Sequence, residues 1–300
     1  MSLTTISAGR VSARIDSMGA QLTSLSLDGR EYLWQADPAW WGKHAPILFP
    51  IVGSLRGDAA ESAQGPCRMP RHGLARIREH AVAEVAPDGS SVTFELSSDA
   101  ETLSAYPYPF VLRMAYAVVA EDTLAQTFTV INTGDAPMPF AVGGHPAFNV
   151  PAPAAPGDAA DETFEECVVR FTRPWTCEAP VIAEGGLLDY EHAYTVLDEA
   201  DELPLTHGLF DRDAVVLSHV PDSTVTLVGA KTGRGVRMSF PGFNHIGIWS
   251  ALGDAPFVAL EPWTGHATLT TEDDVLEHKR DVIVLRPGET CERTFTMTLL

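Results

Sequence analysis

Cysteine and basic residues are scarce in this sequence. Four of its 300 residues are cysteines, scattered without C-x-x-C spacing, so we expect reduced thiols and no cysteine-rich zinc site. Lysine and arginine together number 20 against 40 aspartates and glutamates, which gives a formal net charge of −20. Binding to nucleic acid or to an anionic membrane surface needs clustered cations, so neither is an expected partner.

Long apolar runs are also missing. No run approaches the roughly 20 residues that a membrane-spanning helix needs, and the N-terminus MSLTTISAGR lacks the basic and apolar regions of a secretory signal. We therefore expect a soluble, cytoplasmic protein. Glycine-rich nucleotide loops, zinc-ligand spacings and nucleophile elbows are missing as well, so no cofactor and no metal are expected.

Short β-prone segments are abundant. Hydrophobic residues make up 45% of the chain, enough for a large core. Strands are predicted at 112–119, 124–132, 140–142, 167–171, 214–218, 224–228, 236–240, 245–249 and 257–260, and at the C-terminus, where apolar residues alternate with threonines from 294 to 299. With no fixed-period repeat and no long amphipathic helix, we predict an all-β fold. It is one domain over residues 1–300, a large, mostly antiparallel β-sandwich with few short helices.

Three local signals sharpen this prediction. Leu27-Asp28-Gly29-Arg30 is typical of a hairpin turn. Ser98 and Glu101 have the spacing of a capping box, which predicts one short helix. Residues 151–163 are low in complexity and predict a surface loop. We do not interpret it as an interdomain linker, because strand patterns resume on both sides.

His145 stands on an unusually constrained piece of backbone. It lies within FAVGGHPAFNV at 140–150, after two glycines and before a proline. Glycine permits close backbone approach and proline fixes the following φ angle, so the imidazole is held in a defined position at the end of an apolar strand. The residues alone leave two interpretations: a catalytic histidine in a cleft, or a core histidine bonded to a backbone carbonyl.

Glu261 and His72 are the other candidates for acid–base chemistry. Glu261 ends an apolar strand in FVALEPWTGH, where burial would raise its pKa toward the range of a general base. The alternative is a rim glutamate paired with an arginine. His72 lies in the short cluster RHGLAR, where an exposed loop histidine is the alternative to a functional one.

The ordered set of motifs resembles a known family. The likeness is carried by APILFPIVG at 45–53, RHGLAR at 71–76, GGHPAFN at 143–149, LFDRDAVVL at 209–217 and HIGIWSALGDAPFVALEPWTG at 245–265. In this order, and over nearly the whole chain, they are similar to the aldose 1-epimerase (galactose mutarotase-like) superfamily, and in particular to its LacX-like branch. The resemblance implies a β-supersandwich and a metal-free interconversion of the anomers of a free sugar.

The resemblance also implies roles for individual residues. His145 would be the general acid that protonates the ring oxygen, and Glu261 the general base that takes the proton from the C1 hydroxyl. His72 would hydrogen-bond the sugar near the ring oxygen. The expected partner is thus a small-molecule sugar, and the chemistry needs no redox step and no covalent intermediate.

Further positions are expected to contact the substrate. Arg56 lies where the family often has a basic residue, although Ser54 stands where arginine or lysine is common. Asp213 matches an aspartate of this branch and is also explained as a turn residue. Trp249 offers an apolar face to a pyranose ring, with a core role as the alternative; the same holds for Trp263. Three further histidines are interpreted as structural: His44, His245 and His266.

Other functions are compatible with parts of this pattern. A hexose-6-phosphate mutarotase would need arginines converging at one end of the cleft, for which Arg56, Arg71 and Arg76 are available. A non-catalytic carbohydrate-binding protein of the same fold would have lost the acid or the base, and both are present. A lyase on a β-sandwich would need further basic or metal-binding residues, which the sequence does not offer.

Overall fold

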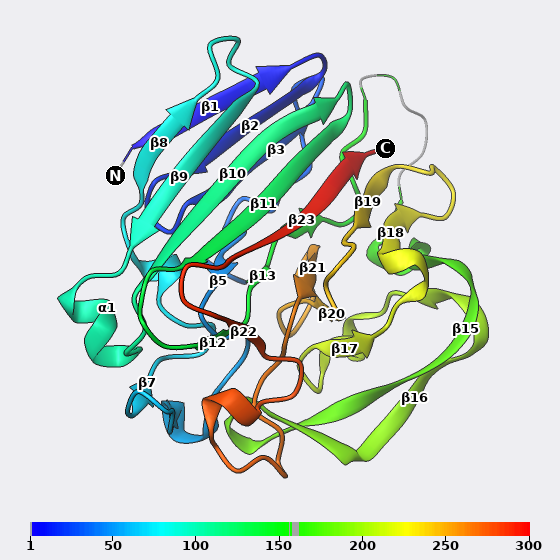
Figure 1. The fold of residues 1–300 in the computed structure, drawn as a ribbon. Coiled ribbons are helices and arrows are strands. Elements are labelled where there is room, and N and C mark those ends of the chain that lie inside the picture. Colours follow the sequence, from blue (N-terminus) through cyan, green and yellow to red (C-terminus); the bar gives the residue numbers. More distant parts are fainter. Residues whose placement is uncertain (1, 156, 158–161) are drawn as a thin grey trace.

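Most of the chain folds into antiparallel strands, as the sequence predicts. The computed structural model describes residues 2–155, 157 and 162–300. The largest sheet has nine strands in the order β16-β15-β18-β19-β23-β11-β10-β9-β8 and spreads across Figure 1. Its members are β8 (Ala81–Val85), β9 (Ser91–Ser97), β10 (Phe110–Ala120), β11 (Thr123–Asn132), β15 (Cys167–Ala183), β16 (Leu187–Pro204), β18 (Thr224–Gly229), β19 (Gly235–Ser239) and β23 (Thr290–Leu299).

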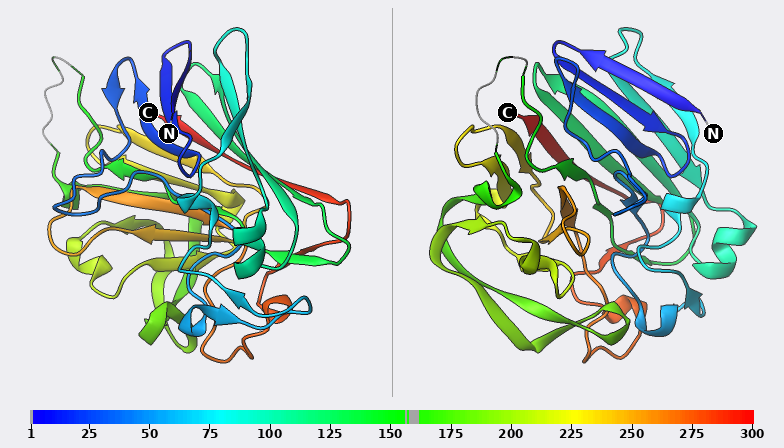
Figure 2. Two further views of the ribbon diagram at one scale, coloured as in Figure 1. Left: turned by 90° about the vertical axis from the view of Figure 1, so that its left-hand side faces the viewer. Right: turned by 180° about the vertical axis from the view of Figure 1, so that it is seen from behind.

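Two smaller sheets lie on the same side of the nine-stranded sheet (Figure 2). The first has four strands in the order of the chain: β1 (Leu3–Ala8), β2 (Val11–Asp16), β3 (Gln21–Leu27) and β4 (Arg30–Glu31). The second has the order β17-β20-β21-β13-β5, with β14 also paired to β21. Its strands are β5 (Ile47–Leu48), β13 (Gly143–Gly144), β14 (Ala147–Asn149), β17 (Val215–Ser218), β20 (His245–Trp249) and β21 (Phe257–Trp263).

The remaining elements are short. Two-stranded pairs are formed by β6 (Ala59–Ala60) with β7 (Cys67–Arg68) and by β12 (Met138–Phe140) with β22 (Ile283–Leu285). The helical segments are α1 (Ala100–Ala105) and the 3₁₀ turns η1 (Arg56–Asp58), η2 (Ala75–Ile77), η3 (Phe164–Glu166), η4 (Glu184–Gly186), η5 (His207–Phe210), η6 (Pro221–Ser223) and η7 (Leu276–His278). Among the described residues, no helix is long and apolar enough to cross a membrane.

The core lies between the large sheet and the two smaller ones. In β23 the alternating residues Phe295, Met297 and Leu299 are buried, as the period-2 pattern predicts. Phe295 packs so closely on β13 that a Cβ atom on Gly144 would lie 2.7 Å from its ring. The glycine before His145 is therefore required by the contact between two sheets.

The predicted hairpin turn and the pairing across the 151–163 segment are both present. Asp28 and Gly29 have φ angles of 51° and 78° between β3 and β4, as a type I′ turn requires. Part of the predicted 151–163 loop lies outside the described residues. Strands from both sides of this segment pair in one sheet, since β11 pairs with β23 and β23 with β19. Its neighbouring strands thus share one core, unlike those of two separate domains.

The short helix is present, but its cap differs from the predicted one. The N-cap is Asp99, not Ser98: the Thr102 amide donates to Asp99 Oδ1 over 2.8 Å, and the Asp99 amide donates to Thr102 Oγ1 over 2.7 Å. Ser98 Oγ instead accepts from the Phe110 amide. The prediction was wrong by one residue because both neighbours are good N-cap types and the position of β10 selects between them.

A long two-stranded arm was missed by the sequence pattern. We predicted a strand over 167–171, but β15 continues to Ala183 and pairs with β16, which runs to Pro204. Many of its side chains are exposed, so the apolar alternation is weak. Pro174 interrupts the run and lies where the register of the ladder shifts, between Arg170 and Trp175.

Candidate active site

A cavity of about 930 Å³ opens over the six-stranded sheet. Five of the six site residues predicted from the sequence line it: His72, His145, Asp213, Trp249 and Glu261. They come from segments far apart in the chain, and the fold brings them together around one space. Its size suits a small organic ligand.

The sheet register places His145 opposite Glu261. Gly143 pairs with Trp263 and Ala147 pairs with Ala259, so residue 145 faces residue 261 across the two strands. Directly opposite residues share a face of the sheet. The Nε2 atom of His145 accordingly lies 3.2 Å from Oε1 of Glu261, with the two side chains 10% and 3% exposed.

Aromatic rings enclose the His145 imidazole. The Trp41 indole stacks on it at 4.8 Å between ring centroids and 21° between planes, and Trp249 meets it edge-on at 5.7 Å. Burial is the main cause that lowers the His145 pKa to about 3, and the positive charges of Arg76 and Lys43 act in the same direction. The imidazole of the empty cavity is therefore neutral at physiological pH.

Glu261 has the opposite shift. Burial, and then the negative charge of Asp213, raise its pKa well above the usual 4.5, while Arg71 and the Trp263 indole act against the shift. Glu261 thus resists deprotonation, His145 resists protonation, and the two side chains are in contact. Together they hold one proton over a wide pH range, and transfer over the 3.2 Å contact converts carboxyl and imidazole into carboxylate and imidazolium.

His72 is oriented by the backbone around it. Its φ angle is 69°, and a Cβ on the next residue, Gly73, would lie 2.3 Å from the Phe49 carbonyl oxygen, so only glycine fits there. The Gly53 amide donates to His72 Nδ1 over 3.1 Å. Because Nδ1 accepts this bond, the proton of the neutral ring lies on Nε2. Burial lowers the His72 pKa well below 6.5, so this neutral form holds at pH 7.

Cations gather in the same cavity. Its lining includes Lys43, Arg71 and Arg76. Arg71 Nη1 lies 3.6 Å from Asp213 Oδ2, and Arg71 Nε donates to Ser54 Oγ over 3.0 Å. Lys43 has no hydrogen-bond or ion-pair partner within the part of the chain that the structure describes. With Arg212, these cations face the acidic lining residues Asp211, Asp213 and Glu261, so the cavity does not share the twofold acidic excess of the whole chain.

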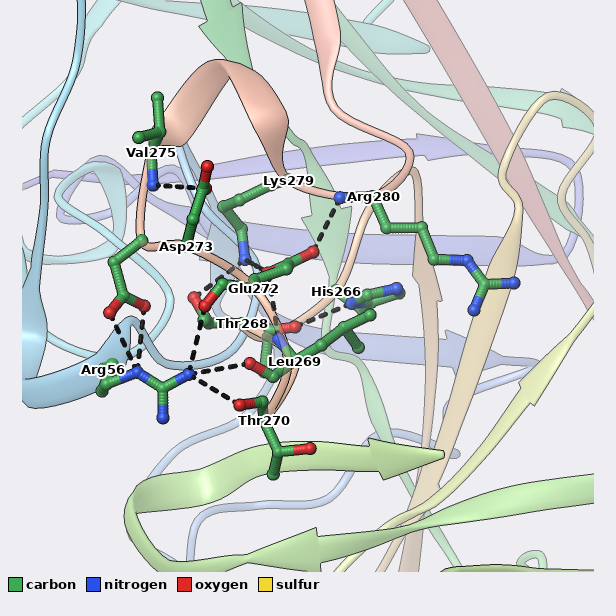
Figure 3. Close-up of polar contacts among 12 residues, drawn as sticks. Arg56, His266, Thr268, Leu269, Thr270, Glu272, Asp273, Val275, Lys279 and Arg280 are labelled. Carbon is green, nitrogen blue, oxygen red and sulfur yellow. Dashed lines mark hydrogen bonds and ion pairs between the residues drawn. The ribbon is translucent and has the colours of Figure 1, made fainter. Parts of the chain in front are cut away.

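Arg56 does not line the cavity. Its Nε donates to both carboxylate oxygens of Asp274, at 3.1 and 2.9 Å (Figure 3). Its Nη2 donates to three backbone carbonyl oxygens, those of Leu269, Thr270 and Glu272. The guanidinium is occupied in holding the segment after β21, so we no longer propose it as a substrate-binding residue. The place of Arg56 in the family motif suggested substrate binding, because the sequence does not show that Asp274 and these carbonyls lie beside it.

Several lining residues were not predicted from the sequence. Trp41, which lines the cavity, lies shortly before the apolar run 45–52. The tip of the β15–β16 arm contributes Val181, Ile182 and Leu188. Two adjacent tryptophans, Trp40 and Trp41, before a buried segment could have indicated a binding site in the sequence. The exposed β15–β16 arm has no sequence pattern that indicates its place at the cavity. Trp263, for which core and substrate-binding roles were open, lines the cavity with its ring over Gly247.

Metal-binding side chains come together outside the cavity. Among the described residues, one group of three such side chains is found: His245, His266 and Asp281. None of the three lines the cavity. Acid–base chemistry by imidazole and carboxylate is what the cavity itself can perform.

Comparison with known proteins shows the family and the fold of the chain. The family model described as aldose 1-epimerase matches residues 2–298. The chain is 37% identical to the plasmid-encoded protein LacX of Lactococcus lactis subsp. lactis, over 97% of both chains. A galactose mutarotase related enzyme from Lactobacillus acidophilus superposes with a TM-score of 0.90 at 29% identity, covering 100% of this chain and 97% of that one. A galactose mutarotase-like protein from Lactobacillus casei gives 0.88 at 29% identity, with full coverage of both chains. The chain belongs to the aldose 1-epimerase family.

Proposed function

We propose that this protein is an aldose 1-epimerase that interconverts the α and β anomers of a free hexose. The observation that carries the proposal is the contact between His145 and Glu261, 3.2 Å apart and buried in a cavity of suitable size. Ring opening of a hemiacetal needs one proton removed and another delivered. The C1 hydroxyl oxygen and the ring oxygen are bonded to the same carbon, so two groups in contact can serve both.

The proposed reaction uses the ionic form of the pair. The Glu261 carboxylate takes the proton from the C1 hydroxyl while the His145 imidazolium gives its proton to the ring oxygen, and the bond between C1 and that oxygen breaks. Rotation about the bond between C1 and C2 presents the other face of the aldehyde. Closure reverses both proton transfers. Sugar hydroxyls that hydrogen-bond the charged groups favour this form over the neutral one of the empty cavity.

The remaining residues bind and orient the sugar. His72 offers an Nε2–H donor, as a hydrogen bond to the ring oxygen or its neighbour requires. Trp249 and Trp263 offer apolar ring surface to the C–H faces of a pyranose. Asp213 is a hydrogen-bond acceptor for a sugar hydroxyl. General acid–base catalysis by the two main residues contributes roughly 10²- to 10⁴-fold each.

Polarimetry tests the proposal. Freshly dissolved α-galactose or α-glucose should lose its excess optical rotation faster with the protein than in buffer alone, and Glu261→Gln should remove most of the increase. Leu252→Ala, an exposed change at the cavity mouth, is the matched control. Equal rates for the wild-type protein and buffer on every free hexose tried would exclude the proposal.

A hexose phosphate is a second candidate substrate class, favoured by the cations in the cavity. This alternative requires arginines in the cavity, and Arg71 and Arg76 line it. Lys43 is a third cation in the lining and, unlike Arg71, has no ion-pair partner among the described residues. Guanidinium and ammonium groups recognise phosphate.

Exchange NMR with α- and β-hexose 6-phosphates separates the two classes. A kcat/KM for the phosphate that exceeds that for the free hexose, and that falls on Arg71→Gln more than the free-sugar value does, would support the second class. Equal or lower values for the phosphate would reject it and leave the free hexose as substrate.

A further inference from the structure

Two buried histidines and a partly exposed aspartate come together outside the cavity, at one end of the six-stranded sheet. His245 begins β20, His266 follows β21, and Asp281 precedes β22. Each offers one ligand atom, and these atoms all lie within 4.8 Å of one another. We propose that they bind a divalent transition-metal ion, zinc in the first place, since two imidazoles and a carboxylate are a common zinc ligand set.

His266 has the orientation of a metal ligand. It is 1% exposed, and its Nδ1 lies 2.7 Å from the carbonyl oxygen of Ala267, a contact drawn in Figure 3. A carbonyl oxygen only accepts, so Nδ1 carries the proton and Nε2 is left with its lone pair. Nε2 is buried and has no hydrogen-bond partner among the described residues. Histidine ligands are commonly fixed by such a carbonyl contact, and an unpartnered buried nitrogen is otherwise costly.

His245 supplies the second imidazole. It is fully buried, with Nδ1 2.8 Å from Ser218 Oγ and Nε2 3.0 Å from Asp281 Oδ2. Its ring centroid lies 4.9 Å from that of His266. A carboxylate only accepts, so without a metal Nε2–H donates to Asp281 and the Ser218 hydroxyl donates to Nδ1. Metal binding would place the proton on Nδ1, which then donates to Ser218 Oγ, and would leave the Nε2 lone pair for the metal.

Asp281 provides the charge and the route for entry. Zinc bonds to nitrogen and oxygen are about 2.0–2.2 Å long, so the three ligand atoms must draw closer than their present separation. The Asp281 side chain is 30% exposed and can rotate to do so, leaving a coordination position for water. Arg280 Nε, 3.7 Å from Asp281 Oδ2, competes for this carboxylate. The Arg280 guanidinium also lies over the Tyr190 ring, 4.9 Å from its centroid, and this contact can hold the side chain when Asp281 turns toward the metal.

His80 shows why the grouping matters more than one unpartnered nitrogen. It is also 1% exposed, with Nδ1 3.0 Å from the Arg78 carbonyl oxygen and Nε2 without a partner among the described residues. Within the described ranges, His80 belongs to no group of three possible metal ligands. His80 is therefore a matched control for His266: the same residue type, burial and backbone contact, without the neighbouring ligands.

The site would tie together the elements that carry the catalytic base. His245 pairs with Trp263 in the sheet, two residue pairs along from Gly247 and Glu261 and so on the same face. A metal at this point would join the start of β20, the segment after β21 and the turn before β22. The role is structural and independent of the substrate proposed above.

Zinc titration of the metal-stripped protein tests the proposal. After dialysis against a chelator, bound zinc would be measured by equilibrium dialysis with elemental analysis, and thermal unfolding followed with and without zinc. We expect one zinc per wild-type chain and a raised unfolding midpoint. His266→Asn and Asp281→Asn should each weaken binding tenfold or more. His80→Asn should bind like the wild type.

Two further variants test where the zinc binds. His145→Asn should leave the stoichiometry and affinity unchanged, which separates this site from the cavity with its own histidines. If His266→Asn does not fold, Asp281→Asn carries the test, because its side chain is partly exposed. No zinc bound at micromolar concentration, wild-type affinity in Asp281→Asn, or a loss confined to His145→Asn would each overturn the proposal.

Discussion

Arg56 and Arg71 stand close in sequence, yet the fold uses them differently. Arg56 donates to Asp274 and to three backbone carbonyls of the segment after β21. Arg71 lines the cavity, with a single long contact to Asp213 and one hydrogen bond to Ser54. Both side chains are partly exposed, at 39% and 46%. Their partners distinguish them, and exposure does not.

The same contrast separates the two regions to which they belong. Around Arg56 and Lys279, charges face charges and backbone oxygens, as a network that stabilises a loop must (Figure 3). In the cavity, His145 Nδ1 has no hydrogen-bond partner in the described part of the chain. Polar atoms left without partners inside a cavity point to a ligand that supplies them, because burying such atoms alone is costly.

The largest effect is expected at the proton-sharing pair. Glu261→Gln and His145→Asn should each lower the catalysed rate by roughly 10²- to 10⁴-fold. Because ring opening needs the base and the acid together, the double variant should be little worse than either single one. Polarimetry on all three variants measures this. Losses that multiply in the double variant would show that the residues act separately.

The two arginines should separate stability from catalysis. Arg56→Gln should lower the free energy of unfolding by about 1–3 kcal/mol, as the loss of charged hydrogen bonds does, with kcat/KM within about twofold of the wild type. Denaturant unfolding and polarimetry measure the two quantities.

Arg71→Gln should show the reverse. Its charge lowers the Glu261 pKa and so favours the carboxylate, and removing it should reduce kcat/KM by clearly more than the change expected for Arg56→Gln. Unfolding should change by less than about 1 kcal/mol, as for other exposed ion pairs. If Arg56→Gln reduced activity and Arg71→Gln reduced stability, our assignment of the two regions would be reversed.

The pH dependence should reflect the shared proton. The active pair carries one proton; it gains a second only when the pH falls toward the lowered His145 pKa of about 3, and loses the one it has only above the raised Glu261 pKa. We expect kcat/KM, measured by exchange NMR and corrected for buffer catalysis, to show no acidic limb at the ordinary histidine pKa of 6.5. An acidic limb centred near that value would mean that His145 titrates like an exposed histidine.

The smallest effect concerns the unpaired lysine. Inorganic phosphate should inhibit competitively if the cavity accepts anions, and Lys43→Gln should raise the inhibition constant roughly fivefold, as the loss of one partly screened charge does. Lys231→Gln, which breaks a surface pair with Glu166, is the control and should leave inhibition unchanged. Identical inhibition in both variants would remove Lys43 from the anion-binding set.

Much of the fold could be predicted from the sequence because its signals are local. Alternating apolar residues predicted β23, and Asp28-Gly29 predicted the β3–β4 hairpin. The β15–β16 arm was missed because its strands are stabilised by pairing with each other and bury little apolar surface. Strand patterns become weak where pairing, not burial, holds a strand in place.

By itself, the sequence determined an acidic, all-β chain of the aldose 1-epimerase family, with His72, His145 and Glu261 as the candidate residues. Glycine and proline mark special backbone positions wherever they occur, so these motifs were legible without a structure. The tertiary structure alone decided that residue 145 faces residue 261, that Trp41 stacks on the imidazole and that Arg56 is occupied elsewhere. Register and charge pairing join segments up to about two hundred residues apart, and such long-range contacts leave no local pattern in a single sequence.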